Sequence, residues 1–184
     1  AVTTVTSTDG DGSSTATYSI SGTDVDDFTI DSSSGVLTFT SSPNFEVPTD
    51  SDANNSYVVQ VQVSDGTNTD TQTITVTVID VNEFTPVITS DVGGSTASIS
   101  NYAENSTSAV TTVTSTDGDG SSTATYTIVG GTDASDFTLG SSSGVLTFNT
   151  TPNFESPHDS DANNSYVVQV QVSDGTNTDT QTIT

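Results

Sequence analysis

The chain has 184 residues, 24 of them acidic, with no lysine or arginine, one histidine and a formal net charge of −24 at pH 7. This excludes nucleic acid and anionic membrane surfaces as partners, because both are recognised by clustered cationic side chains. With no lysine, arginine or cysteine for nucleophilic or phosphate chemistry, we expect no enzyme; a glycosidase-like carboxylate pair is the remaining alternative.

Alternation of apolar and polar residues predicts short β-strands along the whole chain. In chain order they are 15–20, 28–30, 36–39, 56–63 and 71–80. Valine and threonine dominate them, and glycine, aspartate, asparagine and proline separate them. No window favours an amphipathic helix, and no stretch approaches the ~18 apolar residues of a membrane span, so no membrane insertion of this segment is expected.

The sequence is a tandem repeat. Residues 1–20 recur almost unchanged at 109–128, and residues 56–75 recur at 165–184. The repeat length of about 108 residues is the size of one β-sandwich domain. We therefore expect an all-β protein of tandem sandwiches, each with about seven strands in two antiparallel sheets.

The repeat also predicts the domain boundaries. Residues 84–108 have no counterpart before Ala1, and residues 76–83 have none after Thr184. We expect one repeat at 1–83 that lacks its first strand and a second at 84–184 that lacks the end of its last strand. The chain is then a window cut from a longer array; alternatively, each end borrows a strand from a neighbouring chain.

Acidic residues gather where the predicted strands end. An Asp-Gly-Asp turn occurs twice, and other carboxylates follow strands or precede loops. Asn82 lies in the same segment as two of them. The acidic residues of this set are Asp9, Asp11, Glu46, Asp65, Asp80, Glu83, Glu104, Asp117, Asp119, Glu155 and Asp174. Two carboxylates ~4 Å apart repel by about 4 kcal/mol at an effective dielectric constant of ~20. Because Ca²⁺ takes six to eight oxygen ligands, it is the cation that such clusters favour.

Five motifs, in this order, resemble those of cadherin repeats in the form found in giant bacterial surface adhesins. They are the Asp-X-Asp pairs (Asp9 and Asp11, Asp117 and Asp119), Asn44-Phe45-Glu46 and Asn153-Phe154-Glu155, the aspartates after a Val-rich strand (Asp65 and Asp174), the segment Asp80–Pro86, and Tyr102-Ala103-Glu104-Asn105. The resemblance covers the whole chain and implies seven-stranded Greek-key, immunoglobulin-like sandwiches.

The resemblance further implies calcium between consecutive repeats. For the joint around residues 80–86 the implied ligands are Glu46, Asp80, Asn82, Glu83, Asp117, Asp119 and Asp174. Asp9, Asp11 and Asp65 would belong to a preceding joint, and Glu104 and Glu155 to a following one. Asn44, Glu83 and Phe84 depart from the family pattern, which leaves the number of ions per joint open.

The function implied is a calcium-stiffened spacer in a long adhesin or fibre, outside the cell or on its surface, with adjacent repeats of the same array as partners. Two alternatives remain. One is a filament of single chains completed by strand exchange. The other is an adhesion module that binds surface glycans or other copies of itself.

Three further features have simpler interpretations. The loop Asp50-Ser51-Asp52-Ala53-Asn54 resembles the start of an EF-hand calcium-binding loop. It lacks the glycine at position six and the distal glutamate, which excludes a full EF-hand. It is therefore either a local calcium site or a polar loop. His158 is expected in solvent. The tyrosines at 18, 57, 126 and 166 and the phenylalanines are expected in the core.

Overall fold

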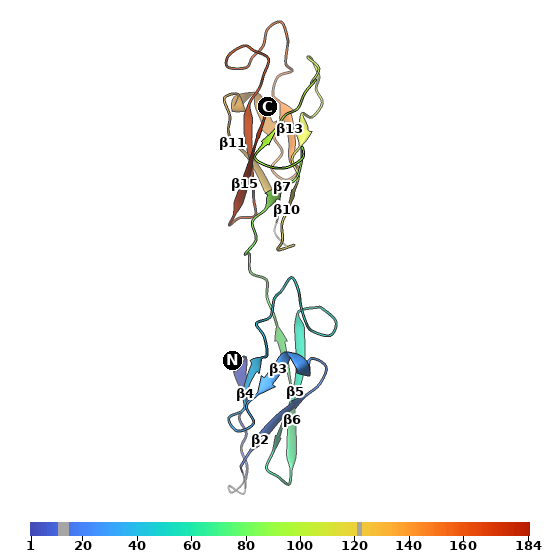
Figure 1. Cartoon of the computed structure of the whole chain (residues 1–184), viewed down its shortest axis with the longest axis vertical. Coiled ribbons are helices and arrows are strands. Elements are labelled where there is room, and N and C mark those ends of the chain that lie inside the picture. The colour runs from blue at the N-terminus through green and yellow to red at the C-terminus, as the bar shows by residue number, and fades with distance from the viewer. Residues whose placement is uncertain (11–14, 121–122) are drawn as a thin grey trace. The chain divides into compact units, whose positions relative to one another are not determined.

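The computed structural model describes residues 1–10, 15–120 and 123–184. They form two compact units, unit 1 (Ala1–Val81) and unit 2 (Asn82–Thr184), drawn in blue to green and in green to red in Figure 1. The predicted ligand Asp11 lies outside the described residues.

Unit 1 contains two three-stranded antiparallel sheets. One has the order β1-β4-β3, and the other has the order β2-β5-β6. The strands are β1 (Thr3–Thr4), β2 (Thr17–Ser21), β3 (Phe28–Ile30), β4 (Val36–Phe39), β5 (Ser56–Ser64) and β6 (Thr69–Thr77). A 3₁₀ turn, η1 (Val25–Asp27), leads into β3.

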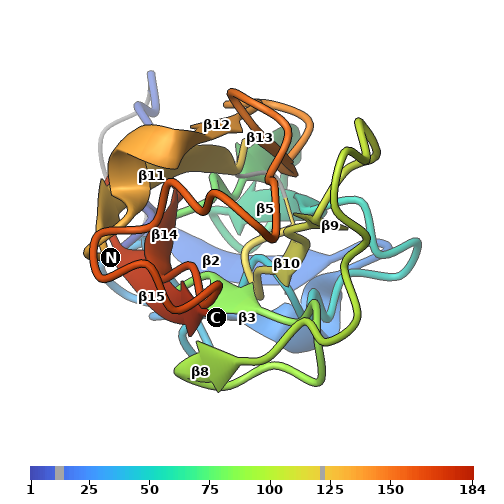
Figure 2. The same cartoon turned by 90° about the horizontal axis from the view of Figure 1, so that it is seen from above.

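Unit 2 repeats this arrangement and adds strands at its start. Its sheets have the orders β11-β14-β15-β8, β12-β13-β9 and β10-β7, and Figure 2 shows β11, β14 and β15 side by side. The elements are β7 (Val87–Ile88), β8 (Thr96–Ala97), β9 (Thr111–Thr112), β10 (Ser115–Thr116), β11 (Thr125–Gly130), η2 (Ala134–Asp136), β12 (Phe137–Leu139), β13 (Val145–Phe148), β14 (Val168–Ser173) and β15 (Thr178–Ile183). The described residues contain no α-helix, and the predicted all-β sandwich class is confirmed.

The core of each unit is built from the alternating strands. In β5, Tyr57, Val59 and Val61 are at most 2% exposed, because successive side chains point to opposite faces and these three share the inner one. Val168 and Val170 of β14 are fully buried in the same way. Burying each valine stabilises its unit by about 1.5–3 kcal/mol.

The prediction that the aromatic side chains lie in the core is correct for the four tyrosines that it names. Tyr18, Tyr57 and Tyr126 are buried, and Tyr166 is half-buried. It is wrong for two phenylalanines, since Phe84 is 45% exposed and Phe154 is 65% exposed. Both lie in loops, where no sheet face is available to cover them. His158 is exposed, as predicted.

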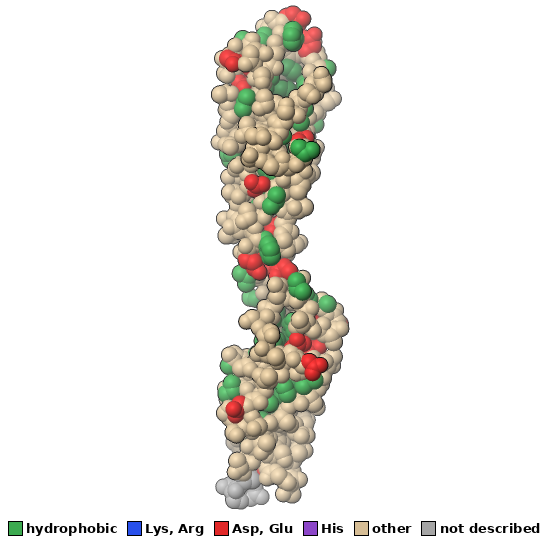
Figure 3. All heavy atoms as spheres, in the orientation of Figure 1, with side chains coloured by type: hydrophobic (Ala, Val, Ile, Leu, Met, Phe, Trp, Pro, Cys, Tyr) green, Lys and Arg blue, Asp and Glu red, His purple; other side chains and the backbone are tan. Residues whose placement is uncertain are grey.

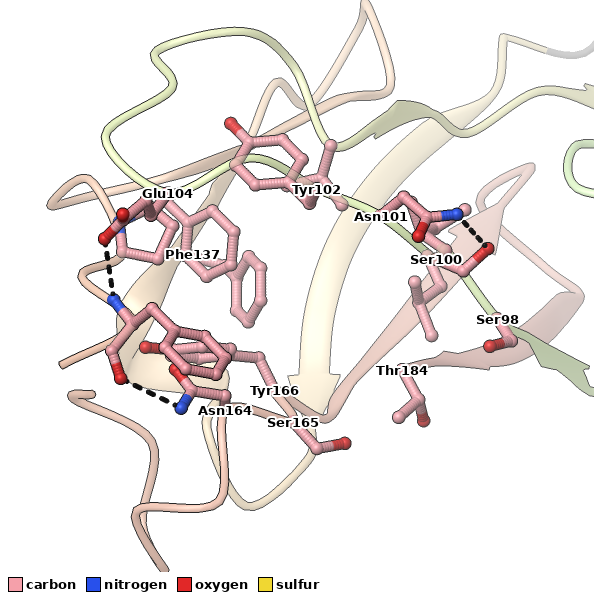
Figure 4. Close-up of a pocket in the computed structure, with 16 residues that line it drawn as sticks. Ser98, Ser100, Asn101, Tyr102, Glu104, Phe137, Asn164, Ser165, Tyr166 and Thr184 are labelled. Atoms are coloured by element: carbon pink, nitrogen blue, oxygen red, sulfur yellow. Dashed lines mark hydrogen bonds between the residues drawn. The ribbon is translucent and has the colours of Figure 1, made fainter. Parts of the chain in front are cut away.

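Unit 2 contains a cavity of about 370 Å³ beside Phe137, Phe148 and Tyr166 (Figure 4). In unit 1, β6 continues to Thr77, and Val76 and Val78 pack against the cluster that contains Tyr57. The repeated sequence therefore encloses different interiors in the two units.

Candidate metal centre

Unit 2 brings together three of the predicted calcium ligands. Asp117 and Asp119 lie in the loop that follows β10, and Asp174 comes directly after β14. One carboxylate oxygen from each of these residues lies within 4.8 Å of the other two. We call Asp117, Asp119 and Asp174 the acidic cluster.

Asp119 also holds the segment at the start of unit 2. It is only 4% exposed, and its carboxylate accepts hydrogen bonds from the backbone N–H of Glu83 (3.3 Å) and of Phe84 (3.1 Å). The backbone N–H of Asp119 in turn donates to Asp117 Oδ1 at 3.2 Å. The predicted ligand Glu83 is thus connected to the acidic cluster through its main chain.

Asn177 connects the same segment to the acidic cluster from the other side. Its Nδ2 donates to Asn82 Oδ1 (3.1 Å) and to the carbonyl oxygen of Phe84 (2.9 Å). A longer bond of 3.5 Å reaches Asp174 Oδ2. The predicted ligand Asn82 is therefore also at this site.

Asp174 is held as a carboxylate by main-chain donors. The N–H groups of Thr176 and Asn177 both donate to its Oδ1 at 2.6 Å. Partial burial raises the pKa of Asp174, but these backbone hydrogen bonds outweigh burial and hold the pKa below its ordinary value. Asp174 is therefore ionised at neutral pH, as a calcium ligand has to be.

The glycine of the Asp-Gly-Asp turn has a structural reason. A Cβ atom at Gly118 would lie 2.5 Å from Cγ of Phe84, so only glycine allows the Phe84 ring to lie on the turn. The ring covers one side of the loop that carries the acidic cluster.

The electrostatics of the acidic cluster favour a cation. Three carboxylates converge, and the chain has no lysine or arginine to neutralise them. On the face drawn in Figure 3, acidic side chains are visible and no lysine or arginine stands among them. A hard divalent ion is the ligand that this donor set fits, because carboxylate and amide oxygens are the atoms that Ca²⁺ prefers.

Unit 1 has the counterpart of the acidic cluster in part. Asp65 Oδ1 accepts the N–H groups of Thr67 and Asn68, both at 2.6 Å. These bonds lower the pKa of Asp65, although the nearby charge of Asp9 acts in the opposite direction. Asp9 and Asp65 line one cleft.

Glu46 and Asp80 come together within unit 1. One carboxylate oxygen of each lies within 4.8 Å of the other. Both oxygens of Glu46 are buried and accept no hydrogen bond from the described residues. The turn before Glu46 is fixed by Asn44 Oδ1, which accepts the N–H of Glu46 at 2.8 Å.

Glu104 and Glu155 are less closely associated. Glu104 Oε2 accepts the N–H of Phe154 at 3.1 Å (Figure 4), so Glu104 contacts the residue next to Glu155. The side chain of Glu155 is exposed. Among the described residues, no group of three acidic side chains includes either glutamate.

Sequence reasoning missed Asn177, which connects Asp174 to the segment 82–84. A signal was present, because Asn68 and Asn177 follow the Asp-Gly turn at the same spacing in both repeats. Asparagine three residues after aspartate is usually assigned only to the turn itself, so its side chain was not considered as a bridge.

No family model and no curated protein matches this chain, but solved structures do. Cadherin domains 3–6 of protocadherin gamma B2 superpose with a TM-score of 0.73 at 18% identity, over 92% of this chain and 42% of that chain. Domains EC1–4 of Drosophila N-cadherin superpose with a TM-score of 0.67 at 21% identity, over 93% of this chain and 40% of that chain. Domains EC22–24 of mouse cadherin-23 superpose with a TM-score of 0.63 at 20% identity, over 92% of this chain and 51% of that chain.

These similarities establish the fold of the chain as cadherin-like. The chain spans about half or less of the length of these relatives. Within the part of the chain that the structure describes, no helix is long and apolar enough to cross a membrane.

Proposed function

We propose that this chain is a calcium-stiffened spacer segment of a long extracellular adhesin or fibre. The observation that carries the proposal is the acidic cluster, in which Asp119 also binds the main chain of Glu83 and Phe84. The cadherin-like fold supports it, because such domains form extracellular adhesion modules. Adjacent repeats of the same array are the proposed partners.

The proposed mechanism is electrostatic. Without an ion, Asp117, Asp119 and Asp174 repel one another, and this repulsion weakens the attachment of segment 82–84 to Asp119. A bound Ca²⁺ replaces the repulsion with attraction and fixes that segment to unit 2. The participation of Glu46, Asp80 and the Glu83 side chain in the same ion shell stays a prediction from the resemblance.

The stability gained follows from mass action. Extracellular calcium modules bind with dissociation constants of roughly 10⁻⁴–10⁻³ M. At a free calcium concentration 100 times the dissociation constant, each independent site adds about 2.7 kcal/mol to the free energy of unfolding. Because a whole domain is stable by only about 5–15 kcal/mol, calcium controls stability as well as stiffness.

The test is thermal melting and small-angle X-ray scattering of the full chain with calcium, with magnesium and with chelator. We expect calcium to raise the Tm by several degrees and to increase the maximum dimension of the particle. Asp119→Asn is expected to abolish both effects, because it removes a ligand and weakens the hold on Glu83 and Phe84.

The matched control is Asp26→Asn, which removes the same charge from an exposed position outside the acidic cluster. It is expected to leave both calcium responses intact. Equal responses of the Asp119→Asn and Asp26→Asn variants, or no response of the unmodified chain, would contradict the proposed function.

A further inference from the structure

A second group of oxygen donors lies outside the acidic cluster, in the loop before β5 in unit 1 and before β14 in unit 2. We call Asp50–Asn55 and Asp159–Asn164 the DSDANN loops, after their shared sequence. Each carries an aspartate, a second aspartate and an asparagine at alternate positions. Nothing in the proposed spacer function uses them.

The first aspartate of each DSDANN loop is buried. Asp50 is 5% exposed and Asp159 is 6% exposed. One oxygen of each, Oδ2, accepts a main-chain N–H, from Asn54 at 2.8 Å and from Asn163 at 2.6 Å. The other oxygen differs between the units. In unit 2, Asp159 Oδ1 is buried and accepts no hydrogen bond from the described residues, whereas in unit 1 Asp50 Oδ1 accepts the N–H of Asn55 at 3.3 Å.

A buried ionised oxygen without a donor costs free energy unless a cation compensates it. The chain contains no lysine or arginine that could do so. The unpaired Oδ1 of Asp159 therefore points to an external ligand of positive charge.

The second aspartate faces the first. In unit 1, the interaction with the Asp50 carboxyl group and, to a lesser degree, desolvation raise the pKa of Asp52. Asp24 adds a further negative charge nearby. The Oδ2 atoms of Asp52 and Asp161 also accept the side-chain N–H of the loop asparagines Asn54 and Asn163, at 2.8 Å and 2.7 Å.

The turn that an EF-hand obtains from glycine is present here in another form. The sixth loop residues, Asn55 and Asn164, have φ values of 63° and 64°. Asparagine tolerates this left-handed conformation better than other residues with a side chain. The missing glycine is therefore no obstacle to the chain reversal that brings positions one, three and five together.

The loops are also held at both ends by another buried aspartate. In unit 2, Asp133 accepts the N–H of Ser160 at 2.7 Å and of Val167 at 2.8 Å. Asp24 does the same in unit 1 for Ser51 and Val58. An ion would thus bind a loop that is already ordered, at a small cost in conformational entropy.

We propose that the DSDANN loop of unit 2 binds one Ca²⁺ ion inside its own unit, through the carboxylates of Asp159 and Asp161 with Asn163. The loop of unit 1 has the same six residues and is proposed to bind a second ion through Asp50 and Asp52 with Asn54. The twelfth position, where an EF-hand has its bidentate glutamate, is the buried Val61 in unit 1. Water completes the shell, and the sites are weak. They exist independently of the acidic cluster and go beyond the proposed spacer function.

The test counts calcium ions bound per full chain by equilibrium dialysis. The double variant Asp52→Asn with Asp161→Asn removes one exposed carboxylate from each loop. We expect it to bind two fewer ions than the unmodified chain. The matched control, Asp26→Asn with Asp136→Asn, makes the same charge change in the turns η1 and η2 and is expected to lose none.

A second measurement assigns the ions to the loops. In ¹H–¹⁵N spectra of the full chain, the backbone amides of Asn55 and Asn164 and the side-chain amides of Asn54 and Asn163 are expected to shift on calcium addition. The shifts should persist in Asp119→Asn, which separates this proposal from the spacer function. Unchanged stoichiometry in the double loop variant, or unmoved loop amides in the unmodified chain, overturns the proposal.

Discussion

Asp24 and Asp133 show how single carboxylates organise this chain. They are 4% and 3% exposed and each accepts two main-chain N–H groups. Burial raises the pKa of Asp133, but the N–H donors of Val167 and Ser160 outweigh it, so the pKa lies below its ordinary value. The acids of this protein are therefore structural as well as candidate ligands.

Acid is predicted to unfold unit 2 in part through Asp133. The pKa of Asp133 is lower in the folded than in the unfolded chain. The stability that its carboxylate contributes is therefore fully present above the unfolded pKa of about 3.9 and is lost as pH falls through the folded pKa. Asp133→Ala, which leaves two buried N–H groups unpaired, should cost about 2–4 kcal/mol at pH 7. Urea unfolding from pH 7 to pH 2 measures both effects; a variant with an unchanged acid transition would contradict them.

Replacing an alanine that has a left-handed backbone conformation is predicted to stabilise the protein, in contrast to Asp133→Ala. Ala53 and Ala162 have φ values of 55° and 58°, where a Cβ atom is strained and glycine is not. Ala53→Gly and Ala162→Gly are each expected to stabilise by about 0.5–1 kcal/mol. Ala97→Gly in strand β8 is the control and should destabilise. Denaturant unfolding of the three variants measures the change in the free energy of unfolding. A loss of stability in both loop variants would contradict the prediction.

Among the elements, the pairing of β11 with β14 depends on one glycine. The register shifts between Ile128 and Gly130, and at Gly131, with φ at 103°, a Cβ atom would lie 2.5 Å from the Cα of Val168. Gly22 is its counterpart in unit 1, and there the nearest atom, the backbone N of Gln60, lies at 3.2 Å.

Gly131→Ala is therefore predicted to destabilise more than Gly22→Ala, by at least about 2 kcal/mol, since the larger clash is with backbone that cannot move without separating the strands. Melting of the two variants, with near-UV circular dichroism to follow tyrosine packing, measures the difference. Equal losses would contradict this prediction.

At the scale of the whole molecule, the net charge of −24 makes every carboxylate part of one repulsive field. Raising NaCl to about 0.5 M shortens the screening length to a few ångströms and is expected to raise the Tm without calcium. Calcium should raise it further at the same salt, because direct coordination is not replaced by screening. Calorimetry measures the Tm under both conditions. If calcium gave no additional rise in Tm at the same salt concentration, its effect would be one of ionic strength alone.

The sequence allowed the fold class and two strands, Phe28–Ile30 and Val36–Phe39, to be predicted with their observed bounds, because local alternation decides them. Pairing is a tertiary property and was harder to predict. The letters SYVVQVQVS form β5 over Ser56–Ser64 in unit 1, but only Val168–Ser173 are paired in unit 2. Propensity is identical in the two copies, so the available partner strand makes the difference.

The candidate site was predictable where its residues repeat as recognisable motifs, as with Asp117, Asp119 and Asp174. The roles of Asn177 and Phe84 were not, because they depend on contacts between segments about 35 to 95 residues apart in sequence. Phe84 illustrates the reason: an aromatic residue predicts burial, whereas here it lies on a glycine at the surface.

The parallel pairing of β8 with β15 has a mechanical consequence. These strands join the beginning of unit 2 to its end through three main-chain bonds, from Thr182 to Ser95, from Thr184 to Ala97 and from Ile99 to Thr184. When a pull is applied between the first and last residues of the unit, parallel strands are loaded in shear. The three bonds then have to break together instead of opening one by one, which gives the unit a resistance to tension that its melting temperature does not measure.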